Sequence, residues 1–450
     1  MHFNSFTTSF ITLLLVLGAR ARNKCDTPGD DKFTEKISEA TRKDVAQFEI
    51  KYENNVKIIK HFSLNTEIRL VCDSTTATDP NTLPLGDEKT TIVASLESIG
   101  FLELLNSVER ISSIEGTDRS TSPCVIKQIE KNITASEKPL MFSNTSKAGS
   151  ITLGIKDSMS PLEKAQWILY VGAILNMDKE AEDIYNKIKN SYNCHRDNLS
   201  KINKKPIAWI HSDKEGYKFK DDNYHRILIS DAGGSPVKPT KNPLTTPVEF
   251  QNDMAKTWLA IDETYLTDIN MVTWLAAYNL TSKASIPLLE SEGLYRTDKI
   301  KNEALNSDWD QSAPSRPDLA IQELISAQYR TYQPDYNNKW ITKLATGYKS
   351  DTVESSQCSN IARQIDIPSC TAKVFKVDET AADSGSSKTS KSNTGAIVGG
   401  VVGGIIGVLA IGGIAFYGRK KYLQSGSQSD KKPGWDFISL KSGRSTASLA

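Results

Sequence analysis

The sequence predicts an α/β protein with two lobes, each a central sheet flanked by helices, joined by a long interdomain helix and followed by one C-terminal transmembrane helix. Three observations predict this architecture. Short β-like runs alternate with helical patterns through the middle of the chain, two consecutive helical patterns lie near its centre, and a long uncharged stretch lies near its end. At 450 residues the chain also exceeds what a single hydrophobic core usually organises.

The composition excludes several classes of protein. Lys and Arg number 55 against 54 Asp and Glu, so a formal net charge of +1 gives no field that would attract nucleic acid. Hydrophobic residues make up 38% of the chain, enough for a packed core, so wholesale disorder is disfavoured. We therefore expect a folded protein with no nucleic-acid partner.

The first 21 residues are typical of a signal peptide. An apolar run from Phe10 to Leu17 precedes Ala19-Arg20-Ala21, a small-x-small pattern found at cleavage sites. The run is too short to cross a bilayer, so we expect cleavage after Ala21. No Lys or Arg precedes the run, which leaves an uncleaved anchor as the alternative. Residues 22–45 are then an N-terminal extension.

Residues 395–417 form an uncharged stretch of 23 residues, long enough to cross the hydrocarbon core as a helix. Arg419, Lys420 and Lys421 follow directly, and such a positive flank stays in the cytoplasm. The sequence thus predicts a plasma-membrane protein with its N-terminus outside the cell and a cytoplasmic tail over 418–450. A glycosylphosphatidylinositol signal is the alternative, and the long basic tail argues against it.

Two features surround the predicted span. Residues 380–394 are rich in Ser, Thr, Ala and Gly and are expected to form a flexible stalk. Within the span, glycines at every fourth position form a smooth stripe that lets two helices approach closely. The stripe indicates a homodimer contact, with glycine bias without pairing as the alternative. Its members are Gly395, Gly399, Gly403 and Gly407.

The cysteines and sequons fit an extracellular location. An even number of cysteines in an oxidising compartment indicates three disulfides. Cys358 with Cys370 is the favoured local pair, in an extension over 348–379, and Cys72 with Cys124 is the second expectation, although every other pairing is formally open. The six cysteines are Cys25, Cys72, Cys124, Cys194, Cys358 and Cys370. The predicted glycosylation sites are Asn132, Asn144, Asn198 and Asn279.

The ectodomain alternates predicted strands and helices, which favours mainly parallel sheets. The expected strands are 68–71, 91–96, 110–114, 206–212 and 258–262. The expected helices between them are 96–105, 124–131, 222–232, 269–278 and 317–329.

The clearest helix begins after Ser160. Ser160 can cap it, Pro161 suits its first turn, and Glu163 completes an S-x-x-E capping box. A second pattern over 179–192 places Ala181, Ile184, Ile188 and Tyr192 on one stripe. Two consecutive helices at mid-chain predict a rigid connection between two lobes.

Several segments together carry a family resemblance. They are PLEKAQWILYVGAILNMDKEAEDIYNKIKNSYN, PIAWIHS and DNYHRILISDAGG, with IRLVCD, TIVASLESIGFLELLNSVERISSI, TSPC, IDETY and DWDQSAPSRPDLAIQELI. In order and spacing they resemble the helical-backbone (class III) periplasmic substrate-binding proteins, which capture ferric siderophores, haem or vitamin B12. The chain is most similar to a eukaryotic, fungal-type, membrane-anchored branch. The resemblance covers about residues 45–347.

The resemblance implies an N-lobe over 46–160, linker helices over 161–193, a C-lobe over 194–347, and a ligand held between lobes that move little. It implies a cell-surface receptor that binds a small ligand non-covalently, with a ferric siderophore, haem, cobalamin or a metal as candidates. A single span cannot pump a solute, so import would need a separate transporter. The alternative is a surface or cell-wall interaction protein that has kept the fold without a small-molecule cleft.

The ligand wall is expected around the strand that opens the second lobe, where aromatic and basic side chains gather. The candidates are Tyr217, Phe219, Tyr224, His225 and Arg226. Tyr217 and Phe219 lie in the polar run SDKEGYKFKDD and are expected to be exposed, whereas Trp209 is expected in the core. A solvated charged loop is the alternative for the basic residues of this run.

No enzyme is expected. The sequence contains no G-x-S-x-G, H-E-x-x-H or G-x-x-x-x-G-K-[ST] pattern. Asp262 and Glu263 in IDETY, and Asp308 and Asp310 around Trp309, suggest acid-base chemistry only weakly because no nucleophile is placed beside them. Histidines are too few and too scattered to predict a metal site, and no cofactor is expected. A surface-tethered hydrolase remains a third, weaker hypothesis.

Overall fold

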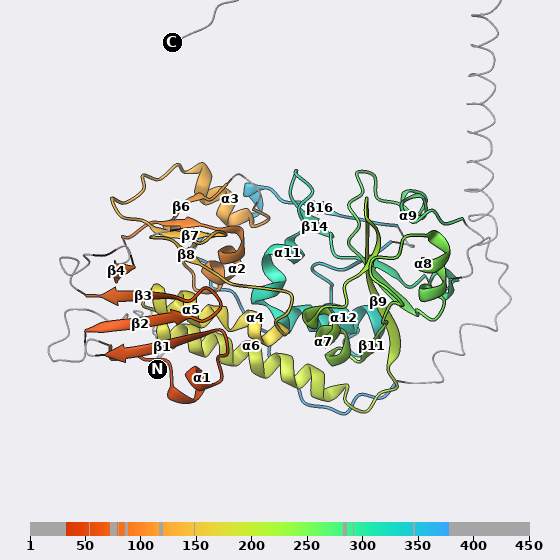
Figure 1. Cartoon of the computed structure of the whole chain (residues 1–450), viewed down its shortest axis with the longest axis horizontal. Coiled ribbons are helices and arrows are strands. Elements are labelled where there is room, and N and C mark those ends of the chain that lie inside the picture. Colours follow the sequence, from red (N-terminus) through yellow and green to blue (C-terminus); the bar gives the residue numbers. More distant parts are fainter. Residues whose placement is uncertain are drawn as a thin grey trace, which may run out of the picture. The chain divides into compact units, whose positions relative to one another are not determined.

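The computed structural model describes residues 33–377 except 54, 73–78, 80, 86–88, 117–119, 148, 282–285, 291 and 345–346 (Figure 1). The predicted signal peptide, stalk, span, tail and glycine stripe lie outside this part, as does Cys25. Within it, no helix combines the length and apolar character needed to traverse a bilayer.

The chain enters a mixed sheet after a short helix, α1 (Glu39–Lys43). Strands β1 (Phe48–Glu53), β2 (Val56–His61) and β3 (Thr66–Val71) form an antiparallel meander, and β4 (Thr82–Pro84) pairs with β3 in parallel. The register places the buried side chains of Ile50, Ile59 and Ile68 side by side. The expectation of mainly parallel sheets is wrong for this meander.

A second, parallel sheet follows in the order β6-β5-β7-β8. Its strands are β5 (Ile92–Ala94), β6 (Ile111–Ile114), β7 (Leu140–Ser143) and β8 (Ile151–Thr152). The crossovers carry α2 (Leu96–Leu104), α3 (Pro123–Glu130) and a 3-10 turn, η2 (Val108–Arg110). The predicted strands and helices of this region are confirmed.

Three helices then follow the first half of the fold, which comprises the elements from α1 to β8. Ser160 caps α4 (Pro161–Ala165) with the predicted capping box, in which Ser160 accepts from the Glu163 amide and Glu163 accepts from the Ser160 amide. The next helix, α5 (Trp167–Ile174), is buried over its whole length. The next helix, α6 (Asp178–Asn198), has 21 residues and is the longest in the described part of the chain.

The second half of the fold comprises the elements from β9 to β16. It holds a six-stranded sheet in the order β10-β9-β12-β13-β15, with β11 pairing β9. Strands β9 (Lys205–Asp213), β11 (Gly234–Pro236), β12 (Leu259–Asp262) and β13 (Leu294–Arg296) run parallel, whereas β10 (Gly216–Phe219) and β15 (Thr342–Lys343) are antiparallel to their neighbours. A small pair, β14 (Ile300–Lys301) with β16 (Asp351–Thr352), lies beside it. The strands predicted at 206–212 and 258–262 are confirmed.

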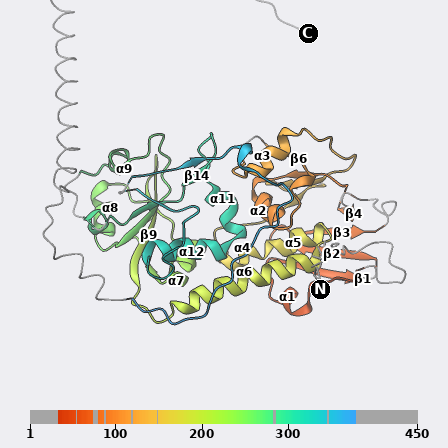
Figure 2. The same cartoon turned by 180° about the vertical axis from the view of Figure 1, so that it is seen from behind.

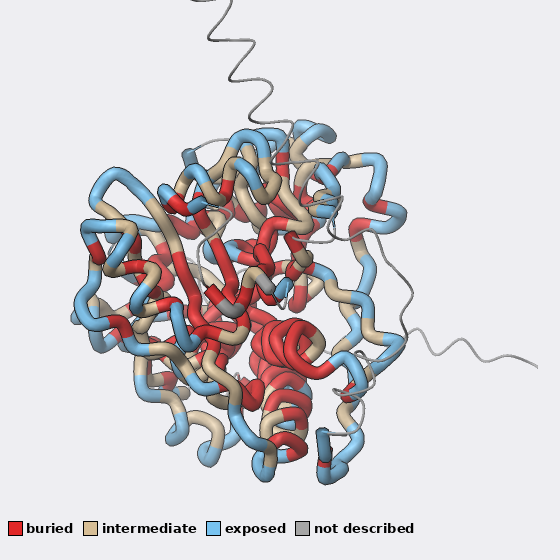
Figure 3. The backbone as a smooth tube through the Cα atoms, turned by 90° about the vertical axis from the view of Figure 1, so that its right-hand side faces the viewer, coloured by how far each residue is buried: buried red, intermediate tan, exposed pale blue. Residues whose placement is uncertain are grey.

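Helices flank this sheet. They are α7 (Asn223–Asp231), α8 (Pro247–Met254), α9 (Met271–Ala277), α10 (Pro287–Glu290), α11 (Asp308–Ser312), η3 (Ala313–Ser315) and α12 (Pro317–Gln328). Alternate residues of β9 supply two cores, Ile207 and Trp209 on one face and Ala208 and Ile210 on the other. Figure 3 shows the buried residues in the interior and the exposed ones on peripheral loops.

Helix α6 belongs to the cores of both halves. Its Ala181, Ile184 and Ile188 pack in the first core, whereas Tyr192 packs in a core of the second half. The predicted stripe is therefore one continuous buried face whose two ends contact different cores. Because both cores pack on one helix, the helix fixes the two halves to each other.

A C-terminal strap, residues 353–377, connects the two halves a second time. It leaves β16 in the second half, and Cys358 and Ile361 then pack in the first core. It returns along α6, where Phe375 enters a core of the second half and the Phe375 amide donates to the Asn198 carbonyl oxygen (Figure 2). A 3-10 turn, η4 (Ser355–Gln357), lies at its start.

Two disulfides hold the strap, and they overturn both predicted pairings. Cys124 of α3 bonds Cys358, and Cys194 of α6 bonds Cys370. Cys72 is disulfide-bonded as well, but not to Cys124. The local 358–370 pairing is wrong because the strap between these cysteines runs from α3 to the far end of α6.

Replacing Cys124 and Cys358 by serine is expected to lower the free energy of unfolding by about 2–4 kcal/mol, because the disulfide closes a long loop in the unfolded chain. The two cysteines are 234 residues apart. Urea unfolding of the variant and the native protein measures the difference. The prediction fails if both unfold at the same urea concentration.

The structure places the four predicted glycosylation sites differently. Asn132, Asn144 and Asn279 are exposed. Asn198 is buried, and its amide nitrogen donates to the Tyr332 hydroxyl at 2.8 Å and to the Thr371 carbonyl at 3.0 Å. Its side chain is thus enclosed by the strap in the folded protein, whereas glycosylation at all four positions stays a prediction.

Candidate functional site

A cavity of about 200 Å³ opens at the carboxyl ends of β12 and β13. Ligands of open α/β sheets commonly bind at this edge, because loops from neighbouring parallel strands converge there. The cavity is lined by Glu263, Thr264, Tyr265, Leu266, Ile269, Arg296, Thr297, Asp298, Lys301, Leu305, Asn306, Ser307 and Asp310. All of these residues belong to the second half of the chain.

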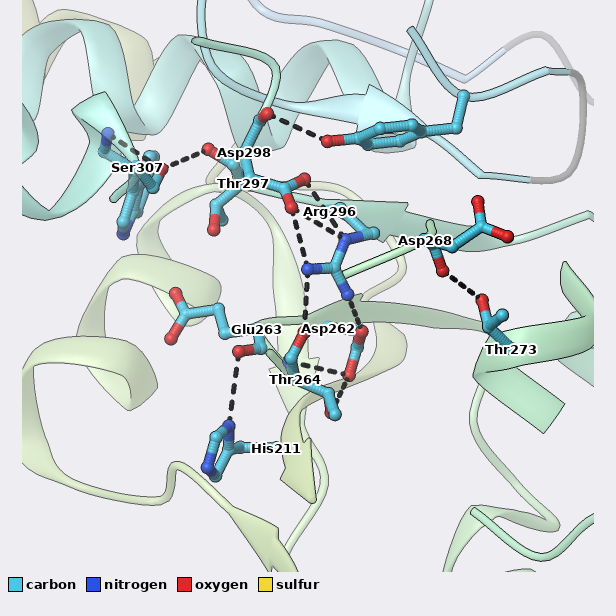
Figure 4. Close-up of polar contacts among 12 residues, drawn as sticks. His211, Asp262, Glu263, Thr264, Asp268, Thr273, Arg296, Thr297, Asp298 and Ser307 are labelled. Carbon is cyan, nitrogen blue, oxygen red and sulfur yellow. Dashed lines mark hydrogen bonds and ion pairs between the residues drawn. The ribbon is translucent and has the colours of Figure 1, made fainter. Parts of the chain in front are cut away.

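A buried charged triad of Arg296, Asp262 and Asp298 lies at the cavity, and Arg296 and Asp298 are part of its lining (Figure 4). Arg296, the last residue of β13, forms an ion pair with Asp262 at the end of β12. Its Nε and Nη2 atoms donate to both oxygens of Asp298 at 2.8–3.1 Å, and Nη2 also donates to the Thr264 carbonyl oxygen at 2.8 Å. Burial acts to lower the pKa of Arg296, but Asp262 and Asp298 outweigh it and raise the pKa. The guanidinium is therefore a fixed positive charge.

Further hydrogen bonds fix Asp262 in place. Its Oδ1 accepts from the Tyr278 hydroxyl at 2.7 Å and from the Thr264 hydroxyl at 2.6 Å. Tyr278 is fully buried. A carboxylate held this firmly serves to orient Arg296 and does not act as a mobile base.

A second ion pair borders the cavity on the side of β10. Glu263, directly after β12, pairs with Lys220, which follows β10. Burial acts to raise the pKa of Glu263, but Lys220 and His225 outweigh it and lower the pKa. The Glu263 carbonyl oxygen lies 3.2 Å from Nδ1 of His211 (Figure 4). Glu263 and Lys220 are therefore both charged.

Asp310 differs from the other acids of the wall. It lies on α11, is exposed, and has no hydrogen bond or ion pair within the described part of the chain. Desolvation by the surrounding protein, and next the negative charge of Glu263, raise the pKa of Asp310 to about 7. Lys220, Asp157 and Lys164 also act on it, the two lysines opposing the rise.

The first half of the chain approaches the site from the other side. Lys164 of α4 pairs with Asp157 at 2.7 Å, and its Nζ lies 3.9 Å from the ring centroid of Tyr224 on α7. Glu97 at the start of α2 is exposed, and desolvation raises its pKa to about 7 while Lys164 opposes the rise. Charged groups of both halves therefore share one region.

The two halves also touch directly beside this region. The Thr121 hydroxyl, just before α3, donates to Asp308 of α11 at 2.8 Å, and the Thr121 amide donates to Gln311 Oε1 at 3.0 Å. A Cβ at Gly100 of α2 would lie 2.5 Å from the Ser315 hydroxyl, so the helix backbone approaches the second half closely. These contacts fill part of the space in which the sequence predicted a ligand.

The predicted ligand wall is not this cavity. Tyr217 and Phe219 are buried on β10 against Phe250, and the expectation that they are exposed is wrong because β10 is a strand with alternating burial. Tyr224 and His225 are buried on α7, whereas Arg226 is exposed. None of the five lines the cavity.

His225 and Trp209 are buried and pack against each other. His225 Nδ1 lies 2.6 Å from Asp222, and its ring packs on Trp209 at 4.7 Å between centroids. Trp209 is 1% exposed, which confirms the prediction that it is a core residue. In the described residues no three His, Cys, Asp or Glu side chains converge to hold a metal ion.

The sequence reasoning missed most of the residues that form the cavity. It noted Asp262, Glu263 and Asp310 only as weak acid-base candidates, and it did not single out Arg296, Asp298 or Lys301. The signal that identifies them is position, because Asp262 and Arg296 end neighbouring parallel strands. Arg296 could not be assigned to that edge without knowing that β13 pairs with β12.

The raised pKa of Asp310 gives a prediction on pH. A carboxyl group whose pKa is higher in the folded than in the unfolded chain stabilises the fold at low pH and loses that contribution as pH rises through about 7. We expect Asp310→Asn, which stays neutral, to gain stability relative to the native protein between pH 5 and pH 8. Urea midpoints at both pH values measure this, and an unchanged difference contradicts the assignment.

The chain folds as an α/β protein whose sheets are flanked by helices. No family model matches the chain, and no curated protein matches it. A periplasmic binding protein from Veillonella parvula DSM 2008 matches with a TM-score of 0.42 and 12% identity over 54% of this chain and 86% of that one. A possible iron-binding (periplasmic solute-binding) protein from Staphylococcus epidermidis matches with a TM-score of 0.40 and 13% identity over 54% of this chain and 100% of that one.

A third solved structure, Helicobacter pylori Ceue with Ni(II) bound, matches with a TM-score of 0.40 and 10% identity over 57% of this chain and 88% of that chain. The first two of these structures are periplasmic binding proteins, the class that the sequence resembles. They do not address the eukaryotic, membrane-anchored branch.

Proposed function

We propose that this protein is a cell-surface receptor that binds a small solute non-covalently in the cavity at the carboxyl edge of β12 and β13. The observation that carries the proposal is the cavity itself, whose lining includes Arg296 and Asp298, both held in a preorganised triad with Asp262. Fixed charges at the mouth of a sheet suit recognition, because they are oriented before the ligand arrives.

The size of the cavity restricts the ligand. A volume of about 200 Å³ lies below the roughly 300 Å³ at which pockets for drug-sized ligands begin. Haem, cobalamin and ferric siderophores are much larger than this space. The described residues also lack a metal-binding group of side chains. The proposal therefore favours a small polar solute over the large chelates expected from the sequence.

The membrane part of the proposal rests on the sequence. A type I span over 395–417 would hold the binding module outside the cell, and import would require a separate transporter. The bonds between the two halves through α6 and the strap support recognition without a large hinge motion.

Native mass spectrometry of the full-length protein purified from its host cells tests the function. We expect a small bound molecule that the variant Ile269→Trp loses, because Ile269 lines the cavity and indole would fill it. The control Val248→Trp, on the exposed face of α8, should keep the molecule. A ligand that both variants retain would place binding elsewhere and overturn the proposal.

The direct contacts between the halves favour one alternative. Thr121 with Asp308, and Gly100 against Ser315, close part of the space between the halves. This packing supports a surface interaction protein that has kept the fold without a small-molecule cleft. Native protein that carries no ligand and binds no small solute would favour this second function.

A further inference from the structure

The cavity holds two opposite charges that the protein leaves unpaired. Asp310 and Lys301 both line it, and in the described part of the chain neither side chain forms an ion pair or a hydrogen bond. No ion pair joins the two residues to each other. Above the Asp310 pKa of about 7, the cavity therefore offers a negative and a positive group at separate points of one small space.

The other charges of the wall are neutralised within the protein. Arg296 is paired with Asp262 and Asp298, and Glu263 is paired with Lys220. Asp310 and Lys301 are therefore the charged residues of the wall that can still form an ion pair with a ligand. A charged group that is partly enclosed by protein gains most from a partner of opposite charge.

Secondary structure fixes the position of both residues. Lys301 lies on β14, whose backbone pairs with β16 and bridges to Ser307. Its Nζ lies 5.6 Å from the ring centroid of Tyr348. The ring takes up none of the three N–H donors as a hydrogen bond, so the ammonium group can still bind an anion. Asp310 lies one helical turn after Ser307, the residue that caps α11. One short segment therefore holds both charges.

Apolar side chains complete the lining. Tyr265 is 65% exposed at the cavity, and Leu266, Ile269 and Leu305 lie beside it. An exposed aromatic ring next to aliphatic side chains provides a surface for a short hydrocarbon group. The ligand thus needs two opposite charges and a small apolar part within about 200 Å³.

We propose that the cavity binds a small zwitterion of the amino-acid class, with its ammonium group at Asp310 and its carboxylate at Lys301. This inference rests on the proposed function, since it names the chemical class of the solute. Tyr265 covers the side chain of the ligand. A ligand with only one charge would leave either Asp310 or Lys301 unpaired.

Calorimetric titration of the full-length protein with each of the small natural amino acids tests the inference, with ethylamine and propionate as singly charged relatives of alanine. We expect at least one amino acid to bind, and its singly charged relatives to bind at least tenfold more weakly. We expect Asp310→Asn and Lys301→Gln each to weaken the amino acid at least tenfold.

Matched controls separate site effects from general charge effects. Glu303→Gln and Lys349→Gln remove exposed charges that do not line the cavity and should leave affinity unchanged. Circular dichroism checks that all four variants are folded. Equal binding of amino acid and singly charged relative, or full affinity in both cavity variants, overturns the zwitterion assignment.

The two proposals fail in different ways. A neutral or singly charged solute that Ile269→Trp excludes, but that Asp310→Asn and Lys301→Gln bind normally, overturns the zwitterion and leaves the cavity as the binding site. Absence of binding by every amino acid also overturns the zwitterion, and the mass spectrum of the native protein then decides whether the cavity binds another solute.

Discussion

Replacing Lys57 by methionine is expected to lower the free energy of unfolding by about 3–5 kcal/mol, because it leaves the buried Asp178 carboxylate without its positively charged partner. Lys57 is 0% exposed. Its Nζ donates to Asp178 at 2.6 Å and to the Ala173 carbonyl oxygen at 2.8 Å, which ties β2 to the start of α6. Urea unfolding of the full-length variant measures the loss.

A surface pair provides the control for Lys57. Lys43 and Glu39 form an ion pair in which both side chains are about 70% exposed, so Lys43→Met should cost no more than about 1 kcal/mol. The double variant Lys57→Met with Asp178→Leu should recover part of the loss, because it removes the unpaired charge. A cost at Lys57 as small as that at Lys43 would contradict the buried pair.

Replacing Arg296 by methionine is expected to remove ligand binding. It should also lower the free energy of unfolding by about 3–5 kcal/mol. Arg296 neutralises two carboxylates, Asp262 and Asp298, and the Asp262 side chain is wholly buried. Arg296→Lys should recover only part of both effects, since an ammonium cannot match the donors that the guanidinium directs at Asp298 and Thr264.

Two measurements separate structure from binding at Arg296. Urea unfolding reports the stability, and native mass spectrometry of the variant reports whether a solute is retained. Arg226→Met is the matched control, because Arg226 is exposed and does not line the cavity. Retention of the solute by folded Arg296→Met protein would contradict the role of the triad.

Local elements were predictable from the sequence because local interactions determine them. The capping box of Ser160 and Glu163 marks α4, and the apolar runs at 206–212 and 258–262 mark β9 and β12. The helix predicted over 222–232 is α7, which ends at Asp231, and Gly233 just after it has a φ of +80°, a conformation that suits glycine.

Features that depend on distant pairing were not predictable in the same way. The disulfides join residues far apart in sequence, so spacing alone favoured the wrong partners. The polar run around Tyr217 contains an alternating Y-K-F-K pattern that signals a strand, and its lysines obscured it. The cavity required knowing which strands are neighbours, because Arg296 and Asp262 meet only through the pairing of β12 with β13.

The disulfide between Cys194 and Cys370 determines how mechanical load would enter the protein. A pull on residue 377 reaches Cys370 through a few residues and passes from there into α6, without peeling any strand from a sheet. The hydrophobic contact of Phe375 yields first, and the covalent link then carries the tension. A load applied at this end of the strap would thus be carried by α6 and not by the edge of a sheet.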